Sequence, residues 1–164
     1  MNIDTFRDMY VAELQELRNV EEQLTHALGK MQEMAQHPRL KQAFATQLKE
    51  THSQRDRLDV ILQRHSATTR EHQDLSMEVI LRETDIWAKM VEDPDLRDAG
   101  QIASAQRVEH YEIAVYGTPA AWARQLGFDE DQRAISDILE EERRTDETLS
   151  GIAKRVVNQD AVST

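Results

Sequence analysis

Carboxylates stand in this chain at positions where the surrounding pattern predicts apolar side chains. The acids that interrupt apolar stripes, each near the middle of a predicted long helix, are Glu21, Glu50, Glu109, Glu112, Glu142 and Asp146. A buried carboxylate must be paired with a cation, protonated or bound to a metal ion, because burying an isolated charge is costly. Six converging carboxylates would repel one another unless cations lay between them. We therefore predict that these six side chains bind two metal ions.

Two of the predicted helices carry their acids in pairs. Glu109 and Glu112 lie about 60° apart on a helical wheel, and Glu142 and Asp146 lie about 40° apart. Each pair can point at one place, where two like charges on an apolar face repel unless a cation intervenes. These pairs are the strongest indication of a metal site in the sequence.

The remaining candidates have structural alternatives. Glu21 could instead form a buried ion pair with an arginine. Glu50 and Gln54, four residues apart, could form a hydrogen-bonded patch between helices rather than bind metal. Tyr116 lies one turn beyond Glu112 and is a candidate auxiliary residue that hydrogen-bonds the site or donates an electron. A core tyrosine with a satisfied hydroxyl explains Tyr116 equally well.

Histidine contributes little to the predicted site. Di-iron bundles commonly carry a Glu-x-x-His motif on two helices, but here Ser53 and Thr145 stand at the positions where such a histidine would lie. His110 lies about 160° from Glu112 on the helical wheel, so it is a weaker candidate ligand, better placed behind the ligands or at a subunit contact. A site richer in oxygen than in imidazole favours iron or manganese over copper.

Hydrophobic periodicity predicts the helices that position these residues. The long helices are expected over 3–35, 38–65, 96–126 and 129–157, with a shorter helix over 75–91 inside a connection that spans 66–94. A connection of that length lets the third long helix run parallel to the second, as in ferritin-like bundles. Pro119 falls inside the third long helix, where we expect a kink or a bulge. The predicted fold is an all-α, ferritin-like four-helix bundle with one domain over 1–158 and a disordered tail over 159–164.

Composition narrows the range of functions. The 164 residues carry 20 basic and 31 acidic side chains, a formal charge of −11, which argues against binding to nucleic acid or to an anionic membrane surface. The absence of Cys excludes disulfides, thiolate metal sites and iron–sulfur clusters. No signal peptide is visible, and no apolar run approaches the roughly 20 residues that span a bilayer. We expect a cytoplasmic protein.

The segment AQRVEHYEIA at 105–114, followed by Tyr116-Gly117-Thr118, resembles the third-helix signature of the YciE/YciF-like family of ferritin-like stress proteins. The segments around Glu21, at 48–54 and at 139–146 support the resemblance, which covers nearly the whole chain. It implies a bacterial four-helix bundle with an extra crossover helix, a tendency to dimerise and a di-metal site. The ligands that it implies are Glu21, Glu50, Glu109, Glu112 and Glu142, with Asp146 and Gln54 as less certain members.

Three functions are compatible with these observations. The leading hypothesis is a homodimeric di-metal protein that holds two iron ions, or manganese, and acts on dioxygen or peroxide during stress. Because the chain has no Cys-based electron-transfer centre, peroxide reduction would need an outside donor or a disproportionation. The first alternative is a non-catalytic structural or protective helical dimer, whose metal site is vestigial or purely stabilising. The second is iron storage, which would require assembly into a cage.

Overall fold

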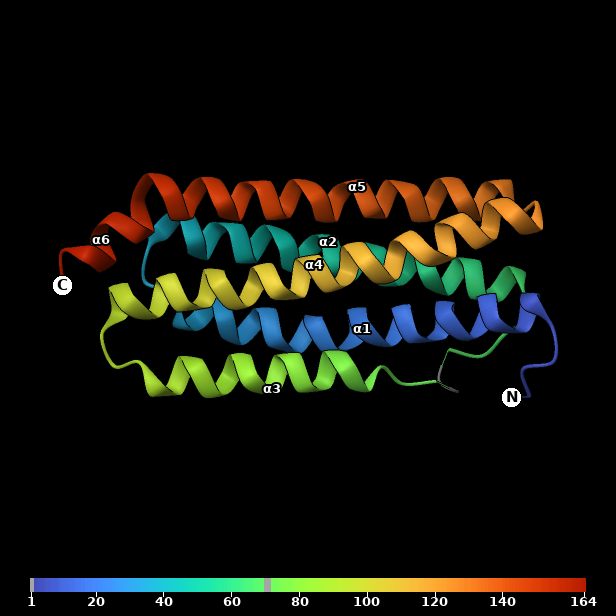
Figure 1. Ribbon diagram of the computed structural model, residues 1–164, viewed down its shortest axis with the longest axis horizontal. Helices are drawn as coiled ribbons and strands as arrows, with labels where there is room; N and C mark the ends of the chain where they lie inside the picture. The colour runs from blue at the N-terminus through green and yellow to red at the C-terminus, as the bar shows by residue number, and fades with distance from the viewer. Residues whose placement is uncertain (1, 70–71) are drawn as a thin grey trace.

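The computed structural model describes residues 2–69 and 72–164, whose regular structure is entirely helical (Figure 1). The elements are α1 (Phe6–Met34), α2 (Pro38–Arg64), α3 (Leu75–Met90), α4 (Pro94–Leu126), α5 (Asp129–Ile152), a π-helical turn η1 (Ala153–Val157) and α6 (Asn158–Val162). The predicted all-α bundle is confirmed. None of the helices in the described ranges contains an apolar stretch long enough to cross a membrane.

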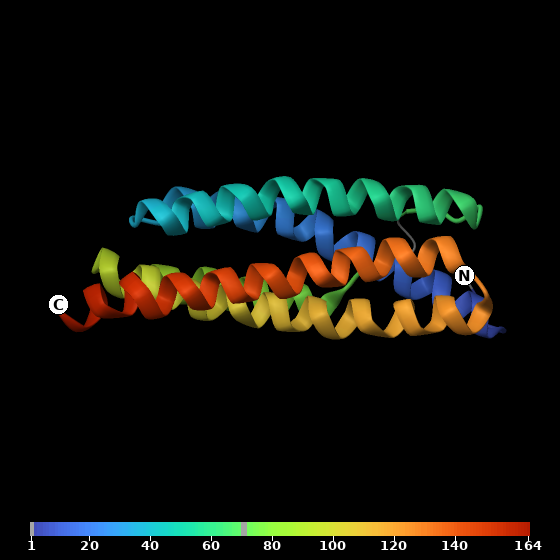
Figure 2. The ribbon, with the colours of Figure 1, turned by 90° about the horizontal axis from the view of Figure 1, so that it is seen from above.

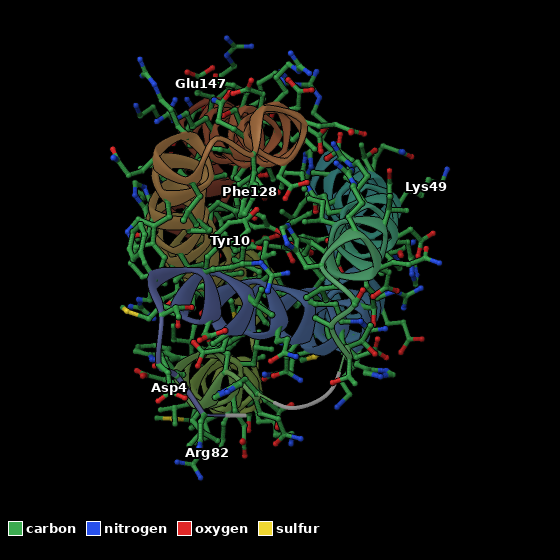
Figure 3. All side chains as sticks on the ribbon, turned by 90° about the vertical axis from the view of Figure 1, so that its right-hand side faces the viewer. Asp4, Tyr10, Lys49, Arg82, Phe128 and Glu147 are labelled. Atoms are coloured by element: carbon green, nitrogen blue, oxygen red, sulfur yellow. The ribbon has the colours of Figure 1, made fainter. Side chains whose placement is uncertain are left out.

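The four long helices form two antiparallel hairpins, α1 with α2 and α4 with α5, which lie side by side (Figures 1 and 2). Helix α3 brings the chain back to the end of the bundle where α2 begins, so α4 runs parallel to α2. This is the predicted crossover. Figure 3, a view along the bundle, shows α3 outside the four long helices, where it packs against α1 and α4.

Helix ends coincide with local sequence signals. Thr5 and Asp8 form a capping box at the start of α1, in which the Thr5 N–H donates to Asp8 Oδ2 at 2.9 Å and the Asp8 N–H donates to Thr5 Oγ1 at 3.1 Å. Asp93 caps α4. Gly127 ends α4 with a φ of 75°, a left-handed conformation that glycine adopts without steric cost, and α5 begins two residues later.

Two segments differ from the sequence-based expectation. Helix α4 continues through Pro119 without the bulge that was one of the two expectations there, and the buried Tyr116 and Ala123 on either side pack against the core. The segment 159–164, for which a disordered tail is predicted, is helical as far as Val162. The π-helical turn precedes α6, and its buried Ala153 and Val157 belong to the core, while α6 itself contacts α4.

The apolar core consists of two clusters that a polar layer separates near the middle of the bundle. One cluster includes Leu28, Phe44 and Ile102. The other includes Leu14 and Ile61. Between them, each long helix places buried polar side chains within about 10 Å along the bundle, and these are Glu21, Gln47, Thr51, Gln54, Glu109, Glu112 and Glu142. The fold therefore concentrates its buried acids in one layer, with apolar packing on both sides.

A second polar network lies within the apolar cluster near the amino-terminal end of α1. The Tyr10 hydroxyl donates to Asp131 Oδ2 at 3.0 Å, and His65 Nε2 lies 2.6 Å from the same oxygen. Arg64 donates to the other carboxylate oxygen at 2.8 Å, and Phe128 packs against both the Tyr10 and the His65 rings. The buried Asp131 thus ties together α1, α2 and α5 at this end of the bundle.

At the opposite end, Asp98 supports the turn between α1 and α2. This buried side chain of α4 accepts hydrogen bonds from the backbone N–H groups of Gln36, at 2.9 Å, and His37, at 2.6 Å. Helix termini leave backbone groups without partners inside the helix, so a carboxylate that reaches them from another hairpin joins the two hairpins.

We predict that Asp98→Ala lowers the free energy of unfolding by about 2 kcal/mol, because it leaves these backbone donors without an acceptor. Urea denaturation followed by far-UV circular dichroism measures the change. Asp137→Ala, at an exposed position of α5, is the control and should change stability by less than about 0.5 kcal/mol. Equal stabilities for the two variants would show that Asp98 does not hold the turn.

Candidate metal centre

The polar layer takes its side chains from all four long helices. Helix α1 contributes Glu21, α4 contributes Glu109 and Glu112, and α5 contributes Glu142. Each of these carboxylates is at most 3% exposed. Helix α2 contributes Gln47, Thr51 and Gln54 and no carboxylate. Three helices thus place four acids in the centre of the bundle, and the fourth helix faces them with amides.

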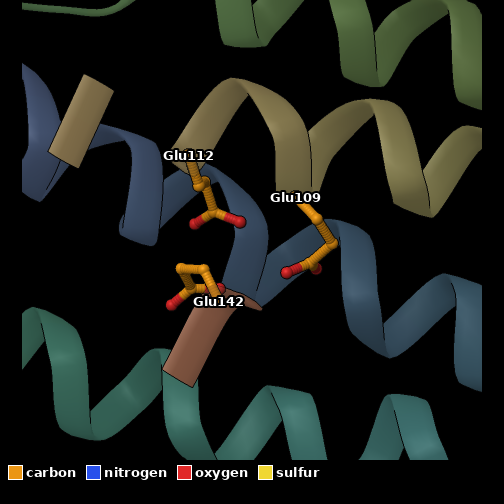
Figure 4. Close-up of side chains that lie close together, drawn as sticks. All are labelled: Glu109, Glu112 and Glu142. Carbon is orange, nitrogen blue, oxygen red and sulfur yellow. The ribbon is translucent and has the colours of Figure 1, made fainter. Parts of the chain in front are cut away.

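Three of the four carboxylates form a compact group. Oxygen atoms of Glu109, Glu112 and Glu142 all lie within 4.8 Å of one another (Figure 4). Figure 4 shows the side chains of Glu109 and Glu112 descending from successive turns of α4 toward Glu142. Metal–oxygen bonds of about 2.0–2.6 Å can span such separations, so a single cation can contact all three groups.

Glu21 extends this group on the side of α1. It lies beside Glu112, closely enough for each carboxylate to affect the pKa of the other. The buried Tyr116 hydroxyl donates a hydrogen bond to Glu21. Tyr116 therefore lies where the sequence places an auxiliary residue, one hydrogen bond away from the carboxylate group.

The two glutamines of α2 close the opposite side. Gln47 donates a hydrogen bond to Glu109, and Gln54 donates one to Glu142. Gln54 Nε2 also lies 3.1 Å from the half-buried Glu141. Gln47 was not among the predicted site residues, although its spacing gives a signal: it precedes Gln54 by seven residues, two helical turns, and so shares its face.

Several of these buried oxygen atoms have no hydrogen-bond partner among the described residues. They are Oε2 of Glu21, Oε2 of Glu109, both carboxylate oxygens of Glu112 and Oε1 of Gln47. Buried polar atoms are normally satisfied, so an unpartnered set of oxygens that face one another needs an explanation. A cation would satisfy these oxygens, and hard ions such as iron and manganese accept oxygen ligands. The residues present therefore fit a metal centre.

Burial dominates the electrostatics of the layer. It raises the pKa of Glu21, Glu109 and Glu112 well above the ordinary glutamate value, and the neighbouring Glu142 carboxylate raises each of them further. Burial also raises the pKa of Glu142 to about 7. Without cations, these carboxyl groups retain protons, since closely spaced like charges in a dry interior disfavour ionisation.

Three predicted candidates lie outside the group. Glu50 is half-buried on α2, because the inward face of this helix passes through Gln47 and Gln54, and Glu50 lies about 60° from Gln47 on the helical wheel. Asp146 lies close enough to Glu109 to raise its pKa, but its side chain is half-buried and accepts a hydrogen bond from Gln106 at 3.0 Å. His110 is 67% exposed and lies 3.4 Å from Asp146. The structure thus places Glu50, Asp146 and His110 at the periphery.

A helical bundle with one crossover and a buried carboxylate layer belongs to the ferritin-like class. The chain is a member of the family described as a domain of unknown function (DUF892), which matches residues 5–162. Protein YciF of Escherichia coli K12 is 38% identical over 162 residues, 98% of each chain. The predicted membership of the YciE/YciF-like family is confirmed.

Solved structures agree with this assignment. The crystal structure of the E. coli stress protein YciF matches with a TM-score of 0.90 at 37% identity, covering 95% of this chain and 99% of that one. YcfI of Rhodopseudomonas palustris, described provisionally as a structural protein, matches at 0.87 and 35% identity over 91% and 95% of the two chains. A Xanthomonas campestris protein at 21% identity, with a TM-score of 0.76, shares the fold.

We predict that the chelator-treated protein becomes less stable as the pH rises from about 4.5 to about 7, and that Glu142→Gln reduces this loss by the contribution of one of the four buried carboxyl groups. The native pKa of Glu142 is about 7 against an ordinary value of 4.5, so the native state binds the proton more tightly. The contribution of the Glu142 proton to the free energy of unfolding is therefore fully present below pH 4.5 and is lost as the pH rises through 7. For one such group this contribution is on the order of 3 kcal/mol.

Urea denaturation across this pH range, with chelator present, measures the effect. Glu147→Gln, at an exposed position of α5, should follow the wild-type pH dependence and serves as the control. Parallel curves for the wild type and Glu142→Gln would contradict the raised pKa.

Proposed function

We propose that this member of the YciE/YciF-like family is a stress-associated protein that binds two iron or manganese ions in the polar layer and acts there on dioxygen or peroxide. The observation that carries the proposal is the set of four buried, mutually facing carboxylates with unpartnered oxygens. When ionised, four carboxylates carry a charge of −4, which two divalent cations balance. Glu109, Glu112 and Glu142 would hold one ion, and Glu21 with Glu112 would hold the other.

Three features suit the polar layer to a reaction with small oxidants. The apolar clusters above and below the layer exclude bulk water. Tyr116 holds Glu21 in position, and Gln47 and Gln54 hold Glu109 and Glu142. When bound, iron or manganese would supply the electron-transfer and Lewis-acid chemistry that side chains lack. Electrons would come from an outside donor, or one peroxide molecule would reduce another, because the chain has no Cys.

One observation favours a non-catalytic alternative. Three donors, Gln47, Gln54 and Tyr116, already satisfy one oxygen each of three carboxylates, so part of the layer is satisfied without metal. In that case the layer would set the register of the helices, as buried polar groups do in some coiled coils. The provisional description of YcfI as a structural protein is consistent with this alternative. Both forms of the proposal keep the homodimer and the cytoplasmic location predicted from the sequence.

Metal analysis tests the centre itself. Wild-type protein loaded with Mn²⁺ or anaerobic Fe²⁺ and freed of excess ions should contain about two ions per chain and unfold at a higher temperature than the chelated protein. Glu112→Gln should lose at least about half of the metal, because Glu112 faces both proposed ions. Glu147→Gln should retain the wild-type content. Less than about a tenth of an ion per wild-type chain, with no thermal shift, would exclude the metal centre.

Peroxide consumption separates an enzyme from a metal-stabilised scaffold. With metal loaded and an artificial electron donor present, Glu112→Gln should consume hydrogen peroxide at least about ten-fold more slowly per chain than the wild type, because the bound ions are required for the reaction. Oxygen release in the absence of donor reports disproportionation. Equal rates for Glu112→Gln and the metal-loaded wild type would show that this centre does not catalyse the reaction.

A further inference from the structure

A groove runs along the seam between α2 and α5, beside the polar layer. It has a volume of about 400 Å³, and its walls combine residues from both helices, among them Arg39, Ala43, Gln47, Glu50, Arg144 and Thr145. Most of the residues that line it are polar or charged, and Ala43, Leu149 and Ile152 add apolar surface, so the groove combines both characters.

Gln47 is the point at which this groove meets the carboxylate group. The residue is 4% exposed, lines the groove and donates its amide N–H to Glu109. Its Oε1 has no hydrogen-bond partner among the described residues, an unusual condition for a buried amide. The Gln47 side chain therefore lies between the groove and Glu109, whereas Glu142 is covered on the α2 side by Gln54, which also contacts Glu141.

The charges of the groove indicate what can pass along it. Arg39 and Arg144 would repel a free cation, and the carboxylates beyond Gln47 would repel an anion. Small uncharged polar molecules meet neither penalty and find hydrogen-bonding partners along the walls, including the Thr145 side chain. Glu50, predicted as a metal ligand, therefore lines the groove and is not part of the buried carboxylate group.

We propose that the groove between α2 and α5 is the entry route for water-sized, uncharged polar solutes, hydrogen peroxide among them, and that Gln47 is its inner gate. Rotation of the Gln47 side chain away from Glu109 would open the carboxylate group to the groove, and the hydrogen bond would close it again. The part that concerns peroxide rests on the proposed function. The part that concerns solvent access to Gln47 does not depend on metal.

The test fills the groove with a large side chain and measures how readily water reaches Gln47. Ala43→Trp places a large side chain one turn from Gln47, within the groove. In the chelated protein, the side-chain amide protons of Gln47 should exchange with water about ten-fold more slowly than in the wild type. NMR measures this exchange, with the Gln47 signals assigned by their loss in Gln47→Leu. Ala88→Trp, at a half-buried alanine that lines a different groove between α1 and α3, should exchange at the wild-type rate.

Thr145→Trp fills the same groove from α5 and should repeat the effect, which keeps the test valid if Ala43→Trp fails to fold. In the metal-loaded protein, both groove variants should keep the wild-type metal content and lose about ten-fold in kcat/KM for peroxide. Gln47 exchange within about two-fold of wild type in both folded variants, or equal slowing in Ala88→Trp, would overturn the route. A wild-type protein that binds no metal would instead overturn the proposed function and leave the exchange measurement as the test of solvent access.

Discussion

Four carboxylates buried at one level of an apolar bundle impose a constraint that the surrounding residues must meet. Each acid costs free energy unless donors, protons or cations compensate for the lost hydration. The chain supplies a donor to three of them, from Gln47, Gln54 and Tyr116. These contacts join residues that are far apart in sequence and connect all four long helices near the middle of the bundle. Apolar side chains can slide past one another with small changes in energy, whereas these hydrogen bonds specify the register of the bundle.

The distribution of acids and amides makes the centre asymmetric. Carboxylates approach from α1, α4 and α5, whereas α2 presents Gln47, Thr51 and Gln54 and no buried carboxylate. An amide can accept from or donate to its surroundings by rotating through half a turn, so α2 is the side of the layer that can rearrange without moving a charge. The groove lies on this same side, along the seam of α2 with α5. The groove and the amide side chains that can rotate therefore both lie on the α2 side of the layer, whereas the other three helices supply the carboxylates.

The helices and the central acids could be predicted because both depend on the 3.6-residue period. Glu21, Glu109, Glu112 and Glu142 interrupt apolar stripes and lie where the wheel places them. The α2 side could not be resolved in the same way, because polar residues at 47, 50, 51 and 54 leave the inward direction uncertain by about 60°. Asp146 shows the other limit. The wheel places it near Glu109, whose pKa it raises, but its half-buried side chain accepts a hydrogen bond from Gln106. Contacts between helices, which no single-helix pattern contains, decide both cases.

The raised pKa values explain how such a layer can exist before any metal arrives. A zinc finger has no folded state without its ion, because its small core cannot hold the ligands together. Here two apolar clusters, an Asp131 network and the Asp98 contact support the bundle on both sides of the layer. The buried acids can therefore remain protonated in the metal-free protein. Glu142, with a pKa of about 7, is the one most readily ionised at neutral pH. A divalent cation that enters must displace protons from these groups, so occupancy depends on pH as well as on metal concentration. Under the proposed function, metal binding would be a reversible exchange of protons for cations within a bundle that is already assembled.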